Sequence, residues 1–347
     1  AAPKSVAAKK LTIIATVSAE SMVVSGKTII TISNSDGVNS NILLTGLDIS
    51  GAQLWQKTID SGVDEIALAS AVDPLGNVWL AGASSAIPVV ESATAPVQAE
   101  NPDGVVAEPV TKLRGDMNQL TLWKLSPLGD LLGTYTLSQS APALISAVSV
   151  NASGVSIVGQ LLEKPFVVSA TSNGVFGKVI SIGTSKTALG AIVRHSDGSV
   201  SVFGSSAETL GGKKLAGVRD GVLIRVSKTG AIASVVRSSA PKANRTWLAA
   251  DSTLALTGFV KSGKIVETAF TKFTMAFAPT WTMRVPSLGT STVLTAGNTT
   301  YGAISSSAAV PGVIGWKPTS ASVLLLTLDG KGVVSGAYGS SEIAEPI

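Results

Sequence analysis

The chain contains 347 residues, with 26 basic and 22 acidic side chains, 35 glycines, one histidine and no cysteine. The absence of cysteine excludes disulfide-stapled scaffolds, iron–sulfur clusters and cysteine nucleophiles, and a single histidine excludes multi-histidine metal centres. Charged residues make up only 14% of the chain and hydrophobic residues 45%, a composition that excludes an intrinsically disordered protein.

The hydropathy pattern predicts no membrane-spanning helix. No apolar run approaches the roughly 20 residues that such a helix needs, and the longest aliphatic clusters, such as 323–326, have the length of a strand. The chain opens with Ala-Ala-Pro-Lys, which fits a mature chain left after signal-peptide cleavage and equally fits an arbitrary boundary. We expect an exported protein, located outside the cell or on the cell surface.

Short β-rich runs joined by tight-turn sequences recur along the chain. The clearest is 69–82, where Asp-Pro-Leu-Gly joins two runs: proline fixes its own φ and glycine accepts the positive φ of a tight turn. Hairpins of this kind are predicted at 21–32, 69–82, 147–159, 191–204, 247–258 and 292–302. A second hairpin follows each of them, at 42–59, 120–137, 166–182, 222–236, 268–285 and 323–338.

Paired hairpins that repeat with a period of about 45 to 55 residues predict an all-β protein, a β-propeller of four-stranded antiparallel blades. One such unit cannot bury its two faces alone, and stacking of blades explains the nearly continuous Ala, Val, Ile and Leu of the runs. Six blades are recognisable, and seven is the alternative. A β-sandwich or barrel of short strands is the other fold left open.

The chain divides into an N-terminal segment, residues 1–18, and the propeller, residues 19–347. The segment contains a run with strand character at 10–17. We expect this run to pair with the last blade and close the ring, because pairing would satisfy an otherwise open sheet edge. A remnant of a seventh blade is the alternative.

Two neighbouring stretches, Leu-Asp-Ile-Ser-Gly-Ala-Gln-Leu-Trp at 47–55 and Ala-Val-Asp-Pro-Leu-Gly-Asn-Val-Trp-Leu-Ala-Gly at 71–82, resemble the bacterial SBBP-type and NHL-like β-propeller repeats. In those families the first motif closes one blade and the second opens the next. The resemblance is strongest in the first two units and weakens along the chain. It implies the propeller fold and no particular activity, because propellers carry many unrelated functions.

Three segments interrupt the repeat between the two hairpins of a unit. The longest, 86–116, is rich in proline and acidic residues and is predicted to be a surface insertion, either a tolerated loop or a docking arm. Two shorter excursions, 207–220 and 307–320, occupy corresponding positions. We expect all three on one face of the propeller, which is the predicted interaction surface.

Basic residues concentrate in the fourth and fifth units. The candidates for binding an anionic polymer are Lys213, Lys214, Arg219, Lys242 and Arg245, because clustered cations attract anions. Blade edges protected from aggregation by lysine are the other interpretation. Nucleic acid is not the expected partner, since no aromatic residue that could stack on bases stands between positions 204 and 246.

Two of the six tryptophans, Trp281 and Trp316, stand at irregular places in the repeat. They are the candidates for exposed contacts with a carbohydrate or a protein. Trp55 and Trp79 occupy repeat positions instead, and we expect them in the packing between blades.

Signatures of catalysis are missing from the sequence. His195 lies in the turn sequence His-Ser-Asp-Gly, and no Gly-x-Ser-x-Gly nucleophile elbow accompanies it. The Asp-Gly pairs are typical of turns and do not form the alternating acidic loop that binds calcium. The sequence therefore predicts no catalytic residue, no metal site and no cofactor.

Composition and architecture together predict a non-catalytic β-propeller, a binding or assembly module that contacts another protein or copies of itself. One alternative is a hydrolase or lyase that acts on a polysaccharide at the propeller axis, where several Asp, Glu, Arg or Tyr side chains should then converge. The other alternative is binding of an anionic polymer through the basic region.

Overall fold

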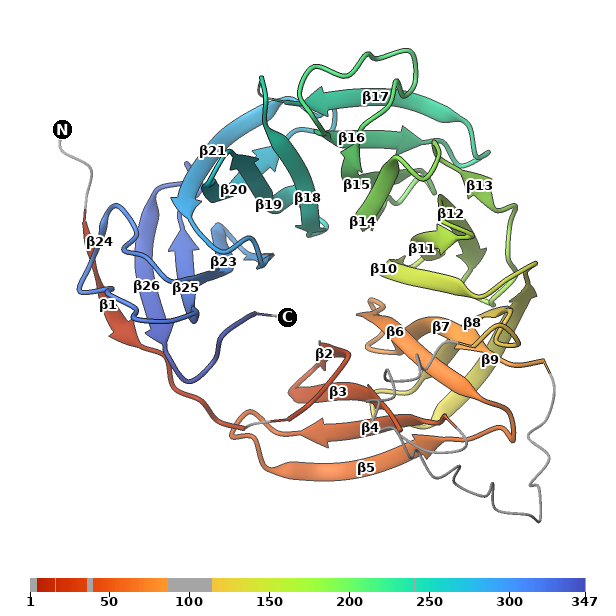
Figure 1. Ribbon diagram of the computed structural model, residues 1–347. Helices are drawn as coiled ribbons and strands as arrows, with labels where there is room; N and C mark the ends of the chain where they lie inside the picture. The colour runs from red at the N-terminus through yellow and green to blue at the C-terminus, as the bar shows by residue number, and fades with distance from the viewer. Residues whose placement is uncertain (1–4, 16, 36–39, 87–113, 240, 347) are drawn as a thin grey trace, which may run out of the picture.

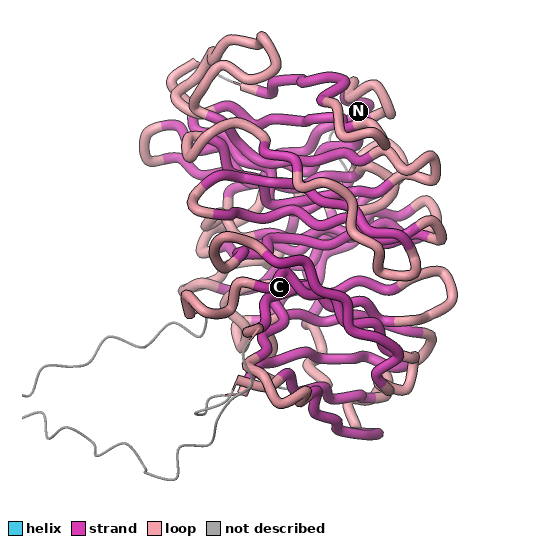
Figure 2. Tube along the Cα trace, turned by 90° about the vertical axis from the view of Figure 1, so that its right-hand side faces the viewer, coloured by secondary structure: helices cyan, strands magenta, loops and turns pink. Residues whose placement is uncertain are grey.

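The computed structural model describes residues 5–15, 17–35, 40–86, 114–239 and 241–346. All regular structure in these residues is β-strand, and they contain no helix long and apolar enough to cross a membrane (Figure 2). The strands form six sheets around a central axis, which Figure 1 views end on. The predicted β-propeller is confirmed, with six blades.

The strands of the first three blades follow one another in chain order. Blade 1 contains β2 (Ser21–Ser25), β3 (Thr28–Asn34), β4 (Ile42–Leu47) and β5 (Gln53–Ile59). Blade 2 contains β6 (Glu65–Val72), β7 (Val78–Ser84), β8 (Gln119–Leu125) and β9 (Leu131–Ser138). Blade 3 contains β10 (Ala143–Asn151), β11 (Gly154–Leu161), β12 (Lys164–Thr171) and the short β13 (Ile180–Ser181).

The last three blades are built in the same way. Blade 4 contains β14 (Thr187–Arg194), β15 (Val200–Ser206), β16 (Asp220–Val226) and β17 (Ile232–Ser238). Blade 5 contains β18 (Asn244–Ala250), β19 (Ala255–Ser262), β20 (Ile265–Phe273) and β21 (Pro279–Pro286). Blade 6 contains β22 (Ser291–Ala296), β23 (Thr299–Ser306), β25 (Ser322–Leu328) and β26 (Val334–Ser340), and its sheet also includes β24 (Val313–Ile314) and β1 (Val6–Lys10).

In each blade the first strand is innermost and the fourth lies at the rim (Figure 1). Because consecutive strands are antiparallel, the connections between the second and third strands all leave one face of the ring, here called the loop face. The tight turns between the first and second strands leave the opposite face. The excursions at 207–220 and 307–320 both leave the loop face, whereas most of the predicted insertion at 86–116 lies outside the described residues.

The N-terminal segment joins the rims of blades 6 and 1. Its strand, β1, begins earlier than the run expected at 10–17, and it runs parallel to β26 with Ala8 opposite Ala337. Residues 11–15 then leave the sheet. A Cβ atom on Gly51, in a turn of blade 1, would lie 2.3 Å from the carbonyl oxygen of Ile14, so the segment lies directly against that turn.

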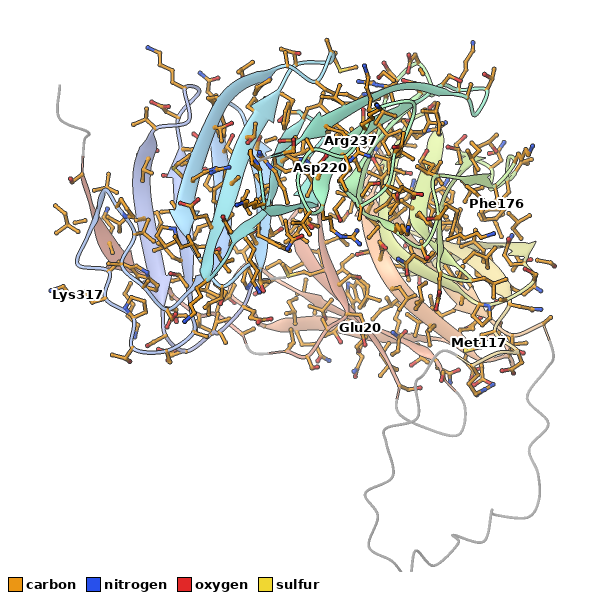
Figure 3. All side chains as sticks on the ribbon, turned by 45° about the horizontal axis from the view of Figure 1, so that its top comes forward. Glu20, Met117, Phe176, Asp220, Arg237 and Lys317 are labelled. Carbon is orange, nitrogen blue, oxygen red and sulfur yellow. The ribbon has the colours of Figure 1, made fainter. Side chains whose placement is uncertain are left out.

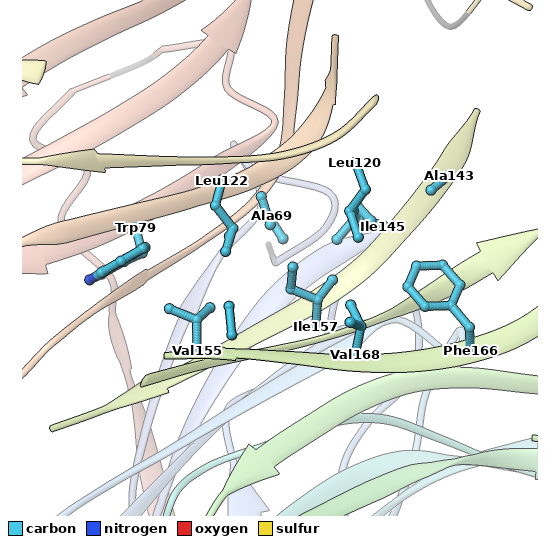
Figure 4. Packing of buried hydrophobic residues seen from close by; sticks show 12 residues of the cluster. Ala69, Trp79, Leu120, Leu122, Ala143, Ile145, Val155, Ile157, Phe166 and Val168 are labelled. Atoms are coloured by element: carbon cyan, nitrogen blue, oxygen red, sulfur yellow. The ribbon is translucent and has the colours of Figure 1, made fainter. Parts of the chain in front are cut away.

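Buried side chains form layers between neighbouring blades rather than one central core. Figure 4 shows the layer between blades 2 and 3, where Trp79 and Leu122 face Val155 and Ile157. Similar buried clusters lie between blades 1 and 2, 3 and 4, 4 and 5, and 5 and 6. Burial of each large aliphatic side chain stabilises the fold by about 2 kcal/mol, so these layers hold the ring together.

Four innermost strands carry a β-bulge at the same position. The pairing register skips one residue between Ala67 and Ala69 in β6, and equivalent bulges occur in β10, β14 and β18. Opposite each bulge stands the glycine that ends the predicted hairpin: Gly82, Gly159, Gly204 and Gly258. A Cβ atom on any of them would lie 1.9 to 2.2 Å from a carbonyl oxygen of the innermost strand. The recurring glycine is therefore a requirement of the bulge.

Candidate functional site

A cavity of about 370 Å³ lies on the propeller axis, and the innermost strands or their flanking residues from all six blades line it. The extra residue of each bulge belongs to its wall: Leu68, Ser146, Gly190 and Leu248. Bulges occur often beside functional sites, because they redirect side chains that a regular strand would point elsewhere. The four bulges therefore shape the cavity.

Hydroxyl groups from four blades reach this cavity, on Ser21, Ser70, Ser146 and Thr292. The hydroxyl of Ser70 donates to Ser21 Oγ across the boundary of blades 1 and 2, at 2.9 Å. The rest of the wall is mostly Ala, Gly, Leu, Ile and Val. The cavity thus offers hydrogen-bonding groups between small apolar patches.

Glu20 is the acidic residue of the described cavity lining, and that lining includes no Asp, Arg or Tyr. Glu20 directly precedes β2, at the inner edge of blade 1, and its side chain is exposed (Figure 3). An enzyme with its site at the axis is expected to bring several charged or phenolic groups together there. The described lining brings one, the carboxylate of Glu20.

A second carboxylate, Glu65, lies near the loop-face end of β6 but does not line the cavity. It is 1% exposed, and the Ser61 hydroxyl donates to its Oε1. Burial raises the pKa of Glu65 above its ordinary value. Glu65 is therefore a buried structural acid, and it does not pair with Glu20 across the cavity.

The raised pKa of Glu65 predicts a pH effect on stability. The contribution of Glu65 to the free energy of unfolding is fully present below the ordinary pKa of a glutamate. It is lost as the pH rises through the higher pKa that Glu65 has in the folded state. We therefore expect the free energy of unfolding of the wild type, relative to Glu65→Gln, to be smaller at about pH 7 than at about pH 4. Urea unfolding of both proteins measures this difference, and an unchanged difference would contradict the prediction.

The basic candidates lie on blades 4 and 5, and the structure brings two of them together, because the amide of Arg245 donates to the Arg219 carbonyl at 2.9 Å. Lys213 and Lys214 are exposed in the loop-face excursion of blade 4, and Lys242 is exposed in the connection to blade 5. The Arg219 guanidinium donates to the Lys186 carbonyl at 3.0 Å. Among the basic candidates, Lys213 and Lys214 are thus the two exposed lysines that are adjacent in the sequence.

Arg245 differs from the other basic candidates because it is largely covered. Its guanidinium lies 4.5 Å from the ring centroid of Trp247, which is a cation–π contact within β18. Burial, with the nearby charge of Arg284, lowers the pKa of Arg245 to about 10. In the structure its contacts are thus those of a packing residue.

The two tryptophan candidates pack against glycines. A Cβ on Gly332 of blade 6 would lie 2.6 Å from the ring of Trp281 in β21, so Trp281 packs between blades 5 and 6. Trp55 of blade 1 packs in the same way against Gly129 of blade 2. Trp316 is 8% exposed, and a Cβ on Gly339 would lie 2.0 Å from its ring. The expected exposure of Trp316 is wrong, because the glycine leaves room for the indole against β26.

His195 contacts a serine, but neither residue lines the axial cavity. Its Nε2 lies 2.7 Å from Ser201 Oγ, and Ser201 is buried in β15. Burial, with the charge of Arg225, lowers the pKa of His195. Elsewhere in the described part of the chain, no group of three His, Asp or Glu side chains is placed to hold a metal ion.

The fold is similar to that of solved lactonase propellers. A proposed 6-phosphogluconolactonase from Bacteroides uniformis matches with a TM-score of 0.53 and 8% identity, over 90% of this chain and 83% of that one. The periplasmic gluconolactonase of Pseudomonas aeruginosa matches with a TM-score of 0.51 and 12% identity, over 92% and 84%. This chain also spans 40% of the length of a prolyl endopeptidase, with a TM-score of 0.49 and 13% identity.

No protein-family model matches the chain, and no curated protein matches its sequence. At such low identity the structural matches establish the propeller fold and no closer family. They nevertheless correct the predicted function. The prediction of a non-catalytic binding or assembly module is wrong, because two of the matched propellers, both with a TM-score above 0.5, are described as lactonases, which are enzymes.

Proposed function

We propose that the protein is a hydrolase that opens a sugar lactone in the axial cavity. The observation that carries this proposal is the placement of Glu20 beside a set of hydroxyl groups in a cavity on the axis. The fold similarity to two lactonase propellers supports the same class of reaction.

Lactone hydrolysis suits a cavity with one carboxylate. A typical glycosidase places two carboxyl groups on either side of the scissile bond, whereas the described lining of the cavity includes one carboxyl group, that of Glu20. A lactone is an ester, so water adds to its carbonyl carbon while one base accepts the proton of that water. The ring C–O bond then breaks, and the proton passes to the departing alkoxide oxygen.

Three polar groups of the cavity, on Glu20, Ser70 and Ser146, have a role in this scheme. Glu20 is the general base. The hydroxyl of Ser146 donates to the carbonyl oxygen, where negative charge develops in the transition state, and Ser70, whose own proton goes to Ser21, accepts from a sugar hydroxyl. The small residues of the wall leave room for the sugar ring.

The Glu20→Gln variant tests the proposal. Removal of a general base is expected to slow enzymatic acid release from δ-gluconolactone by about 100-fold or more. Comparison of the thermal midpoints of the two proteins distinguishes a lost general base from a loss of folded protein. A pH-stat measures the release, with the spontaneous rate subtracted.

The Glu163→Gln variant is the matched control, because Glu163 is an exposed carboxylate in the turn between β11 and β12. It removes the same charge at a residue that does not line the cavity and should keep the wild-type rate. Equal rates for the two variants would contradict the role of Glu20.

We further propose that the blades derive from SBBP-type or NHL-like repeats and that the protein is exported. The motifs at 47–55 and 71–82 support the first proposal. The absence of cysteine is compatible with export, and the similar lactonase of Pseudomonas aeruginosa is described as periplasmic. Fractionation of cells that express the gene, followed by immunoblotting, tests the location.

A further inference from the structure

Blades 4 and 6 carry closely similar loops between their second and third strands. The hydroxyls of Ser206 and Ser306 each donate to the carbonyl two residues further on and accept from the amide of that same residue. Further along each loop, Gly212 and Gly312 both have a positive φ, of 72° and 82°. The two loops therefore correspond at Ser206 and Ser306 and again at Gly212 and Gly312, and this alignment places 213–214 at the position of β24.

In blade 6 this loop and the outer strand hold β1 between them. The first half of β1 pairs with β24, and its second half, Ala8–Lys10, pairs with β26 at Ala337 to Gly339. The amide of Val6 donates to the Gly312 carbonyl at 2.9 Å, and the amide of Leu11 donates to the Gly339 carbonyl at 2.8 Å. Blade 6 thus has a slot for an extended strand, and β1 fills it.

The corresponding position in blade 4 is an open groove of about 390 Å³, here called the blade 4 slot. Its walls are 212–214 from the loop and Val235 to Arg237 from β17. A matching register shift, with Val226 opposite Ile232 and Leu328 opposite Val334, aligns these strand residues with Ala337 to Gly339 of blade 6. In the described chain β17 is the edge of its sheet, so the slot holds no strand.

The blade 4 slot is held in shape by Arg237. Its Nε donates to the carbonyl of Lys213 at 3.1 Å, and its Nη1 donates to Asp220 Oδ2 at 3.0 Å. The first bond joins the loop directly to the outer strand, and the second anchors the guanidinium on β16. The groove is therefore preformed, which reduces the entropic cost of binding.

We propose that the blade 4 slot binds an extended acidic peptide segment as an added strand along β17. Strand addition supplies affinity through backbone hydrogen bonds, as β1 shows in blade 6. The charge of the slot sets the specificity, because Lys213 and Lys214 replace the uncharged Val313 and Ile314 of blade 6. Like-charge repulsion disfavours a second copy of β1, which carries Lys9 and Lys10.

A peptide pair tests this proposal with the whole chain. The probe is a labelled, capped peptide with the sequence of residues 5–11 in which both lysines are replaced by glutamate, and the native peptide is its partner. Fluorescence anisotropy should show binding of the acidic peptide at least about tenfold tighter than that of the native one. Hydrogen exchange should slow at 232–238 when the acidic peptide is bound.

Two charge variants provide the matched comparison. Lys213→Glu with Lys214→Glu should weaken binding of the acidic peptide by about tenfold or more. Lys261→Glu with Lys264→Glu makes the same change of net charge at exposed positions around the turn between β19 and β20 and should weaken it much less. Equal losses in both variants, preference for the native peptide, unchanged exchange in β17, or no binding would each overturn the proposal.

Discussion

Replacement of Arg237 by alanine is expected to lower the free energy of unfolding by about 3 to 5 kcal/mol. The side chain of Arg237 is 8% exposed, and that of its partner Asp220 is fully buried. Without the guanidinium, the carboxylate stays buried with only the amides of Ala216 and Gly217 as donors. The loop also loses its bonds from Arg237 to the carbonyls of Glu208 and Lys213.

Urea unfolding followed by tryptophan fluorescence measures this loss. The matched control is Glu342→Gln, which removes the exposed ion pair between Lys10 and Glu342, 3.5 Å long. Exposed pairs contribute little, so this variant should stay within about 0.5 kcal/mol of the wild type. A loss of less than about 1 kcal/mol for Arg237→Ala would show that the pair does not stabilise the loop of blade 4.

Replacement of Gly204 by alanine is expected to cost about 3 kcal/mol. A Cβ atom there would lie 2.0 Å from the carbonyl oxygen of Ala188, which is backbone and cannot rotate away. The bulge in β14 would have to shift, and the buried layers on both sides of blade 4 would shift with it.

Gly330→Ala is the control for Gly204→Ala. A Cβ on Gly330 would lie 3.6 Å from the side chain of Asn298, which is ordinary contact, and Gly330 does not have a positive φ. The same unfolding experiment should give a change within about 1 kcal/mol for this variant. Similar values for the two variants would show that the bulge does not require a glycine opposite it.

The fold could be predicted from turn chemistry. Pro74 and Gly76 predict a tight turn at 73–76, and the chain forms it there, with the amide of Gly76 donating to the Asp73 carbonyl at 2.9 Å. The glycine that ends each hairpin was visible as a repeat feature, but its cause was not. The cause is the bulge on the neighbouring strand, which becomes evident only when the two strands are paired.

The axial site could not be predicted in the same way. Its wall takes a few residues from each innermost strand, and these residues lie far apart in the sequence. Ser70, Ser146 and Gly190 belong to runs of small residues that also suit packing between blades. Glu20 lies just outside the first strand, without a motif around it. Only closure of the ring brings these residues together.

For Trp316 the sequence predicts a contact site where the structure has a packing residue. Trp316 occupies no regular position of the repeat, and this predicts an exposed side chain. It is buried against Gly339, and nothing in the sequence around Gly339 indicates that it leaves room for an indole. The sequence shows Lys213 and Lys214 of blade 4 only as part of a cluster of basic residues. Its place beside a strand slot depends on the match between two loops, whose shared residues are mainly serine and glycine.

Acid release from δ-gluconolactone by the wild type and by Ser146→Trp tests the role of the axial cavity most directly. Ser146 is an exposed residue on the bulge of β10, so an indole there fills the cavity without entering a buried layer. We expect enzymatic release by the wild type and only the spontaneous rate with the variant, at a thermal midpoint within about 2 °C. Release at the same rate by both proteins, or none above the spontaneous rate by the wild type, would contradict the axial site.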